Sequence, residues 1–212
     1  MHFEAPAMIT IIIVFILVAS LGLLYWFPVR HWFNQWGTTK QEVTGVMPGD
    51  KVIAYPTNSA MQAVTIATTP ENIWPWLVQM GYKRGGLYSY DWLDRLFGFL
   101  DRPSTKDILP QFQHLSVGDK IPWGHGEYLT VKEIEPPKSL VLDYQGRGME
   151  WVWQFVLNPI DTKHTRLITR GIERTPQSFI WRLGMLFMEP AAFIMTRRML
   201  LGVKERAEAL SR

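Results

Sequence analysis

Hydrophobic positions are continuous near the start of the chain, where residues 8–27 contain no charged side chain. About 20 helical residues, each rising about 1.5 Å, span about 30 Å, which matches the hydrocarbon thickness of a bilayer. Aromatic residues typical of a membrane interface end this run, and Pro28 follows it. We therefore predict one transmembrane helix at 8–27, ended by Pro28 and preceded by a short flank at 1–7.

A cleaved signal peptide and a buried core helix are the alternatives for this segment. A signal peptide needs basic residues before its apolar run and a small-residue cleavage site after it. The N-terminus instead has Glu4 and lacks Lys and Arg. Arg30 and Lys40 lie beyond the run. The positive-inside rule therefore predicts a single-pass protein of the cell membrane with its C-terminal body in the cytoplasm.

Beyond the apolar run, polar and turn-forming residues give way to an alternating pattern. Residues 28–58 are predicted to be a juxtamembrane linker, and residues 60–68 alternate as a β-strand does. Thr69 as N-cap and Pro70 at the first helical position begin a short helix. Residues 88–97 predict a second short helix.

The C-terminal part of the chain changes from strand-like to helical periodicity. Strand-like runs with turn signals between them lie at 120–123, 127–134, 139–144, 149–157 and 165–174. Residues 178–211 have helical spacing, with an interruption expected at Glu189 and Pro190. This order predicts an α+β domain at 59–212, in which an antiparallel sheet buries one face against the long C-terminal helix.

Four segments of this body resemble bacterial proteins of the START-like, or SRPBCC, superfamily. They are WGTTKQEV with PGD at 36–50, IWPWLVQMG at 73–81, RGGLYSYDWLDRLFG at 84–98 and EPAAFIMTRRMLLGVKERAE at 189–208. The members they resemble are those described as polyketide cyclase/dehydrase-like. The resemblance covers about residues 36–210. It implies a helix-grip fold, in which a curved sheet surrounds the terminal helix and leaves a cavity for hydrophobic small molecules. It implies no particular reaction.

One predicted strand is aromatic on a single face. Trp151, Trp153 and Phe155 alternate with other residues, so they point to one side of the sheet, which we expect to be the interior. Aromatic residues of the short helices and methionines of the terminal helix would make this interior wide and adaptable. The predicted ligand-binding residues are Trp74, Trp76, Tyr88, Trp92, Tyr128, Trp151, Trp153, Phe155, Met185 and Met188. A filled core is the alternative.

Titratable residues of the body are candidates for acid/base catalysis, which needs such a group in a partly dry pocket. The catalytic candidates are Tyr88, Asp91 and His125, and Tyr90, Arg95, Tyr128, Glu173 and Glu189 are further titratable residues. Asp91 and Arg95 are four positions apart, so a surface ion pair is the competing interpretation. His125 lies in the turn GHGE, where a solvated histidine is the common case.

Composition argues against several other classes of function. The net charge is only +3, without a basic stripe, so we predict no nucleic acid binding. The five histidines are scattered and cysteine is absent, so we expect neither a metal site nor a thiolate nucleophile. The sequence has no phosphate-loop or dinucleotide motif, and no cofactor is predicted.

One further segment bears on the membrane. Residues 179–188 are apolar except for Arg182, yet about ten residues are too few to cross a bilayer. We predict that this segment lies at the bilayer surface with Arg182 toward lipid phosphate, and burial in the core is the alternative.

These patterns favour a membrane-anchored binding domain for a lipid or another hydrophobic small molecule. Its expected partners are membrane lipid and that small molecule. A cyclase- or dehydratase-like enzyme that uses acid/base residues in the same cavity is one alternative function. A membrane-localised interaction or assembly factor is the other.

Overall fold

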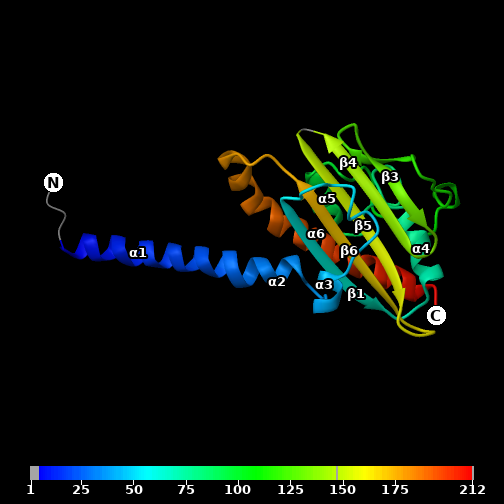
Figure 1. The fold of residues 1–212 in the computed structure, drawn as a ribbon, viewed down its shortest axis with the longest axis horizontal. Helices are drawn as coiled ribbons and strands as arrows, with labels where there is room; N and C mark the ends of the chain where they lie inside the picture. The colour runs from blue at the N-terminus through cyan, green and yellow to red at the C-terminus, as the bar shows by residue number, and fades with distance from the viewer. Residues whose placement is uncertain (1–4, 147, 212) are drawn as a thin grey trace.

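The computed structural model describes residues 5–146 and 148–211, which form a helical rod and the body that it joins at one end (Figure 1). The rod consists of α1 (Ala5–Leu24), a π-helical turn (Tyr25–Val29) and α2 (Arg30–Asn34). Its side chains from Met8 to Leu24 are largely exposed and apolar. The long apolar helix expected from the sequence is therefore present.

The prediction that Pro28 ends this helix is wrong. Pro28 lies within the π-helical turn, in which the N–H of Arg30 donates to the carbonyl of Tyr25, five residues earlier. A wider turn accommodates a residue that has no N–H of its own. The helix continues into α2, whose Phe33 is buried in the body and thereby fixes the end of the rod there.

The body is built on one antiparallel sheet in the order β1-β6-β5-β4-β3-β2. Its strands are β1 (Asn58–Ile66), β2 (Lys120–Gly124), β3 (Glu127–Glu135), β4 (Ser139–Gly146), β5 (Met149–Pro159) and β6 (Thr165–Arg174). The pairing register is irregular between Pro122 and Gly124 and between Val131 and Glu133. Irregularities of this kind bend a strand and increase its twist. Each of these strands overlaps a run that was predicted from strand-like patterns and turn signals.

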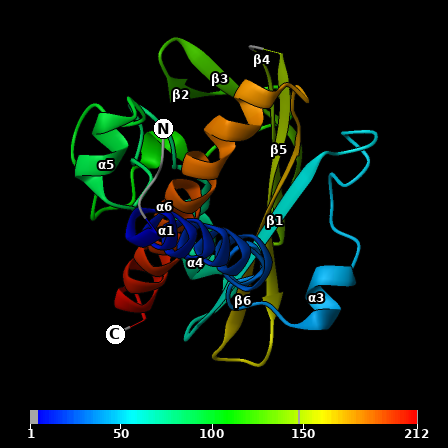
Figure 2. The same cartoon turned by 90° about the vertical axis from the view of Figure 1, so that its left-hand side faces the viewer.

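The long terminal helix α6 (Phe179–Ala209) crosses the inner face of this sheet (Figure 2). The expected interruption at Pro190 is wrong, because the helix is continuous there. Pro190 cannot donate to the carbonyl of Leu186, four residues earlier. That carbonyl instead accepts a hydrogen bond from the hydroxyl of Tyr25 at 3.1 Å. The rod thus satisfies a backbone group that the proline leaves free.

Two short helices, α4 (Pro70–Val78) and α5 (Asp91–Leu96), lie on the same side of the sheet as α6 (Figure 2). Buried apolar residues of α4, α6 and the inner sheet face form the main core, with Trp76, Phe155 and Leu200 among its fully buried members. A curved antiparallel sheet that holds a long C-terminal helix is the helix-grip fold of the α+β class. The predicted fold is confirmed.

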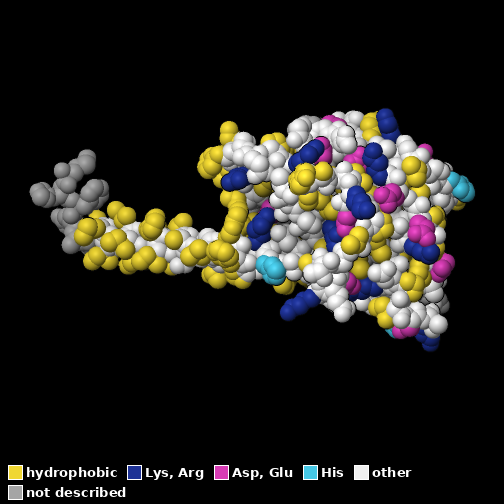
Figure 3. Space-filling view, viewed as in Figure 1, with side chains coloured by type: hydrophobic (Ala, Val, Ile, Leu, Met, Phe, Trp, Pro, Cys, Tyr) yellow, Lys and Arg dark blue, Asp and Glu magenta, His cyan; other side chains and the backbone are white. Residues whose placement is uncertain are grey.

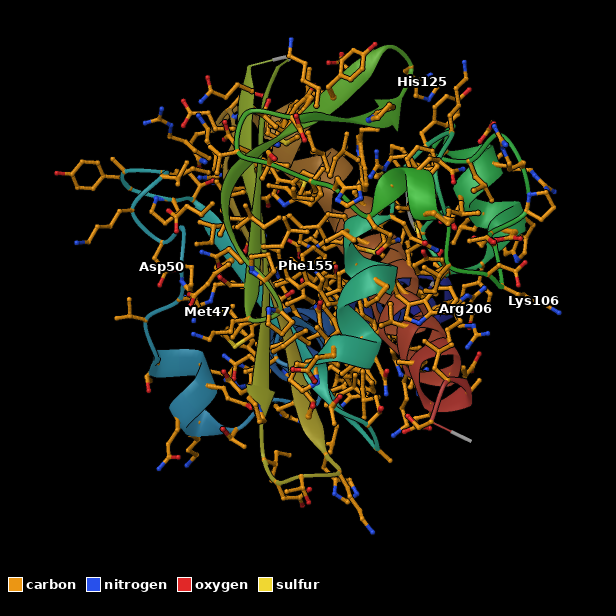
Figure 4. The ribbon with its side chains drawn as sticks, turned by 90° about the vertical axis from the view of Figure 1, so that its right-hand side faces the viewer. Met47, Asp50, Lys106, His125, Phe155 and Arg206 are labelled. Carbon is orange, nitrogen blue, oxygen red and sulfur yellow. The ribbon has the colours of Figure 1, made fainter. Side chains whose placement is uncertain are left out.

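The stretch predicted as a linker is folded onto the outer face of the sheet over much of its length. It contains α3 (Lys40–Thr44), and Met47 is buried against Met61 and Ile168. Asp50 pairs with Arg170 of β6 at 2.8 Å. In Figure 4, Met47 and Asp50 lie on one side of the sheet and Phe155 on the other. These residues therefore belong to the folded body.

Candidate functional site

Small residues in the middle of the sheet leave room beneath the first half of α6. Ala60, Gly171 and Trp153 lie side by side in register across β1, β6 and β5, on the inner face. A Cβ added at Gly171 would come within 3.2 Å of the indole nitrogen of Trp151, so this indole extends over the glycine. The two small residues provide no side chain that would fill the space above them.

A cavity of about 440 Å³ occupies this space, between the inner sheet face and the first half of α6. The helix contributes apolar side chains to it at every turn, and these are Trp181, Met185, Met188, Ala192, Phe193, Met195 and Met199. Methionine is flexible and polarizable, so such a wall adapts to ligands of different shape. The alternative prediction was that the aromatic face of β5 packs against a filled core. At this end of the sheet that alternative is wrong, because the aromatic face borders the cavity.

Aromatic rings form the wall opposite the helix. The ring centroids of Trp151 and Trp153 are 5.3 Å apart, and each lies 5.4 Å from the ring of Trp123 on β2. Phe99, from the loop after α5, continues this series at 4.9 Å from Trp123. Rings that pack on one another hold their positions, so this wall is rigid where the α6 wall is adaptable.

Asp94 of α5 adds a carboxyl group to the cavity lining, although it is fully buried. Its Oδ1 accepts a hydrogen bond from the hydroxyl of Ser89 at 2.6 Å. Its Oδ2 has no hydrogen-bond partner among the described residues. Burial therefore raises the pKa of Asp94 from its usual 3.8 to about 6, although the Ser89 hydroxyl opposes this shift.

This raised pKa predicts that Asp94→Asn stabilises the protein at neutral pH. The folded protein holds the Asp94 proton more tightly than the unfolded chain, so this group favours folding below about pH 4, and that contribution is lost as pH rises through about 6. Asparagine carries no charge, so the variant should be about 2 kcal/mol more stable at pH 7 and unchanged at pH 4. Chemical unfolding at both pH values measures this difference. The exposed Asp107→Asn should show no such change, and a less stable Asp94→Asn at pH 7 would contradict the prediction.

A cluster of polar and charged side chains lies where the cavity meets the end of the rod. Arg30 of α2 donates to both carboxylate oxygens of Glu189, at 2.6 and 2.7 Å. Asn58 of β1 donates to Glu173 of β6 at 2.8 Å and to Glu189 at 3.3 Å. Burial and the nearby Glu189 raise the pKa of Glu173 above its usual value, and Arg30 and the bond from Asn58 oppose this.

The structure places the predicted ligand-binding residues in three different environments. The residues that line the cavity are Trp151, Trp153, Met185 and Met188. Trp76, Tyr88 and Phe155 are buried in the core, and Trp74 packs against it. Trp92 and Tyr128 are largely exposed, and Tyr128 lines a separate hollow together with His125.

The three catalytic candidates do not meet in the cavity, since none of them is among the described residues that line it. Tyr88 is buried, which raises the pKa of its phenol and keeps it protonated. Asp91 accepts hydrogen bonds from the backbone N–H and hydroxyl of Ser104, which fixes a loop. His125 is exposed at the upper edge of the body in Figure 4, and its Nε2 lies 2.9 Å from the carbonyl oxygen of Phe97.

Sequence reasoning missed Asp94, Phe99 and Trp123 as parts of the site. Asp94 and Phe97 are three positions apart, so a helix places them on one face. This spacing was the one indication in the sequence that Asp94 faces the same side as an aromatic residue. Phe99 and Trp123 come from a loop and a short strand whose meeting depends on the tertiary fold. Glu173 and Glu189 were named as titratable residues, but their sharing of one site was not predicted.

No protein-family model matches the sequence, and no curated protein matches it either. Solved structures with a similar chain path include a hypothetical protein from Helicobacter pylori, with 12% identity, a TM-score of 0.48, and coverage of 76% of this chain and 95% of that one. CalU16 from Micromonospora echinospora has 14% identity, a TM-score of 0.36, and coverage of 71% and 84%. A protein from Mesorhizobium loti has 18% identity, a TM-score of 0.41, and coverage of 72% and 98%. These likenesses concern the chain path alone.

Proposed function

We propose that this protein is a membrane-anchored binding domain for a lipid or another hydrophobic small molecule. The observation that carries the proposal is the cavity of about 440 Å³ with its wall of tryptophan, phenylalanine and methionine side chains. Concave, mostly apolar sites of this size with a few polar groups are typical of small-molecule binding sites. The comparisons agree with this role only at the level of the fold.

The exposed apolar surfaces support the membrane part of the proposal. Within the described part of the chain, two helices are long and apolar enough to cross a membrane, at Ala7–Asn34 and at α6. Hydrophobic side chains cover the rod and the beginning of α6, at the same end of the body (Figure 3). The second half of α6 is held in the core by residues such as Leu200 and Val203. We therefore propose that the rod spans the bilayer and that residues 179–188 rest on its surface, with the body in the cytoplasm.

The proposal predicts that the wild-type protein carries a bound molecule and that a variant with a smaller cavity binds this molecule less well. The full chain, extracted from carbonate-washed membranes and studied by native mass spectrometry, should carry a molecule of lipid-like mass. Ala60→Leu adds bulk where the inner face of β1 lines the cavity, and should reduce the occupied fraction about tenfold. Ser59→Leu makes a similar change on the exposed outer face of the same strand and should leave occupancy unchanged. An unliganded wild-type protein, or equal occupancy in both variants, would contradict the proposal.

Acid/base catalysis is a second candidate function, which Asp94 favours. A carboxyl group with a pKa of about 6 in a mostly apolar cavity suits general acid or base catalysis near neutral pH. The same mass spectra separate the two functions. A binding domain should retain the same molecule in the wild type and in Asp94→Asn, whereas an enzyme should retain product in one and unconverted substrate in the other.

A further inference from the structure

The charged groups of the cavity all have the same sign. Among the described residues that line it, the side chains with a formal charge are Asp94, Glu173 and Glu189, and lysine, arginine and histidine do not contribute. A ligand with an anionic head group, such as a fatty acid, would meet these carboxylates, of which Arg30 pairs with Glu189 alone among the described residues. Like charges at short range disfavour binding.

Asp94 and Glu173 form no ion pair among the described residues, and Glu173 is the one of these two that lies beside Trp151. Arg30 is bound through two hydrogen bonds to Glu189, which neutralises that carboxylate. Among the ion pairs between described residues, none includes Glu173, and its hydrogen-bond donor is the uncharged amide of Asn58. Glu173 therefore brings a partly buried negative charge to the cavity that the neighbouring arginine does not pair directly.

Aromatic rings lie beside this carboxylate. Trp151 is the direct cross-strand partner of Glu173, and both side chains face the cavity. Trp153 stacks on Trp151 with an angle of 26° between the ring planes. Indole rings attract cations through their negative faces, and an aromatic site with a nearby carboxylate is a typical arrangement for binding an ammonium group.

We infer that the ligand of this cavity is a cationic amphipath, with an apolar tail under α6 and an amine or quaternary ammonium group between Glu173 and the rings of Trp151 and Trp153. This inference rests on the proposed binding function and narrows it to one class of ligand. The Met-rich wall holds the tail, and Glu173 with the indole rings selects the head group.

A series of ligands with one tail and three head groups tests the inference. The full chain is placed in nanodiscs of an uncharged glycolipid, so that the bilayer brings neither net charge nor an ammonium group. Octyltrimethylammonium, octanol and octanoate are titrated separately by calorimetry, and heats from empty nanodiscs are subtracted. The ammonium compound should bind about tenfold more tightly than octanol, and octanoate more weakly than octanol.

Glu173→Gln provides the variant that isolates the charge. Glutamine keeps an oxygen that accepts from Asn58, so the local hydrogen bond is preserved. The variant should lose about tenfold in affinity for octyltrimethylammonium and stay within about twofold for octanol. The matched control is Glu150→Gln, because Glu150 pairs with Arg174 on the opposite face of the same two strands. Its affinities should equal those of the wild type.

The outcomes separate the inference from the function on which it rests. Binding of octanol without any preference for the cation, or octanoate binding as well as the ammonium compound, overturns the inference and leaves the proposed function standing. An equal loss of all three ligands in Glu173→Gln also overturns it, since a structural role has no charge preference. If none of the three ligands binds to the wild type, the proposed function fails and the inference fails with it.

Discussion

Asp50→Ala is expected to lower the free energy of unfolding by about 3 kcal/mol, the lower end of the usual cost of removing one partner of a buried ion pair, because the Asp50 side chain is still 22% exposed. Asp50 accepts from Arg170 through both carboxylate oxygens, at 2.8 and 2.9 Å, and from the amide of Gln154 at 2.8 Å. The Arg170 side chain is only 9% exposed. Alanine would leave this guanidinium with backbone carbonyls such as that of Gly45 as its acceptors.

Urea unfolding of the full chain in nanodiscs, followed by tryptophan fluorescence, measures this loss. Glu135→Ala is the matched control, since Glu135 and Lys138 form an ion pair with both side chains more than half exposed. Removing that pair should change the unfolding free energy by less than about 1 kcal/mol. The double variant Asp50→Ala with Arg170→Met should recover part of the loss, because it removes the unpaired charge. Equal small losses for Asp50 and Glu135 would show that the segment around Asp50 does not stabilise the body.

The sheet was predictable because alternation with period 2 reports directly which strand face is buried. Trp151, Trp153 and Phe155 show this for β5, since all three do face the interior. The two proline errors have a different origin. Pro28 and Pro190 are tolerated through a π-helical turn and through the hydroxyl of Tyr25, and neither arrangement is visible in the local sequence. Local rules treat proline as a break, whereas tertiary contacts decide whether the helix continues.

The cavity was predictable only in part, because a hollow depends on which residues face one another. Periodicity assigns Trp153 to the interior but does not show that it lies next to Gly171 and Ala60, on other strands. The same limit applies to charge. Glu173 and Glu189 are 16 positions apart in the sequence, yet Asn58 donates a hydrogen bond to both. Their shared environment comes from strand pairing and from the path of α6.

Gly202→Ala is expected to destabilise the protein by about 3 kcal/mol, although alanine is the better helix former. Gly202 lies in the buried half of α6, where the helix passes close to the loop before α5. A Cβ at this position would lie 2.1 Å from the carbonyl oxygen of Tyr88 and 2.9 Å from its Cβ. Neither atom is the end of a flexible side chain, so α6 or the loop must move, and each is fixed by core packing.

Gly184→Ala, in the exposed half of the same helix, is the control that separates packing from helix propensity. A Cβ at Gly184 would have no heavy atom within 4 Å. This change should therefore stabilise the helix by up to about 1 kcal/mol, the difference between the two residues in a helix interior. In urea unfolding, the free energy of unfolding should therefore fall for Gly202→Ala and rise for Gly184→Ala, although the substitution and the helix are the same. Stabilisation in both variants would show that α6 does not approach Tyr88 closely. The close packing at Gly202 holds the second half of α6 in place, and the first half of the same helix covers the hollow above Gly171. Without that packing, the position of α6 over the cavity would not be fixed.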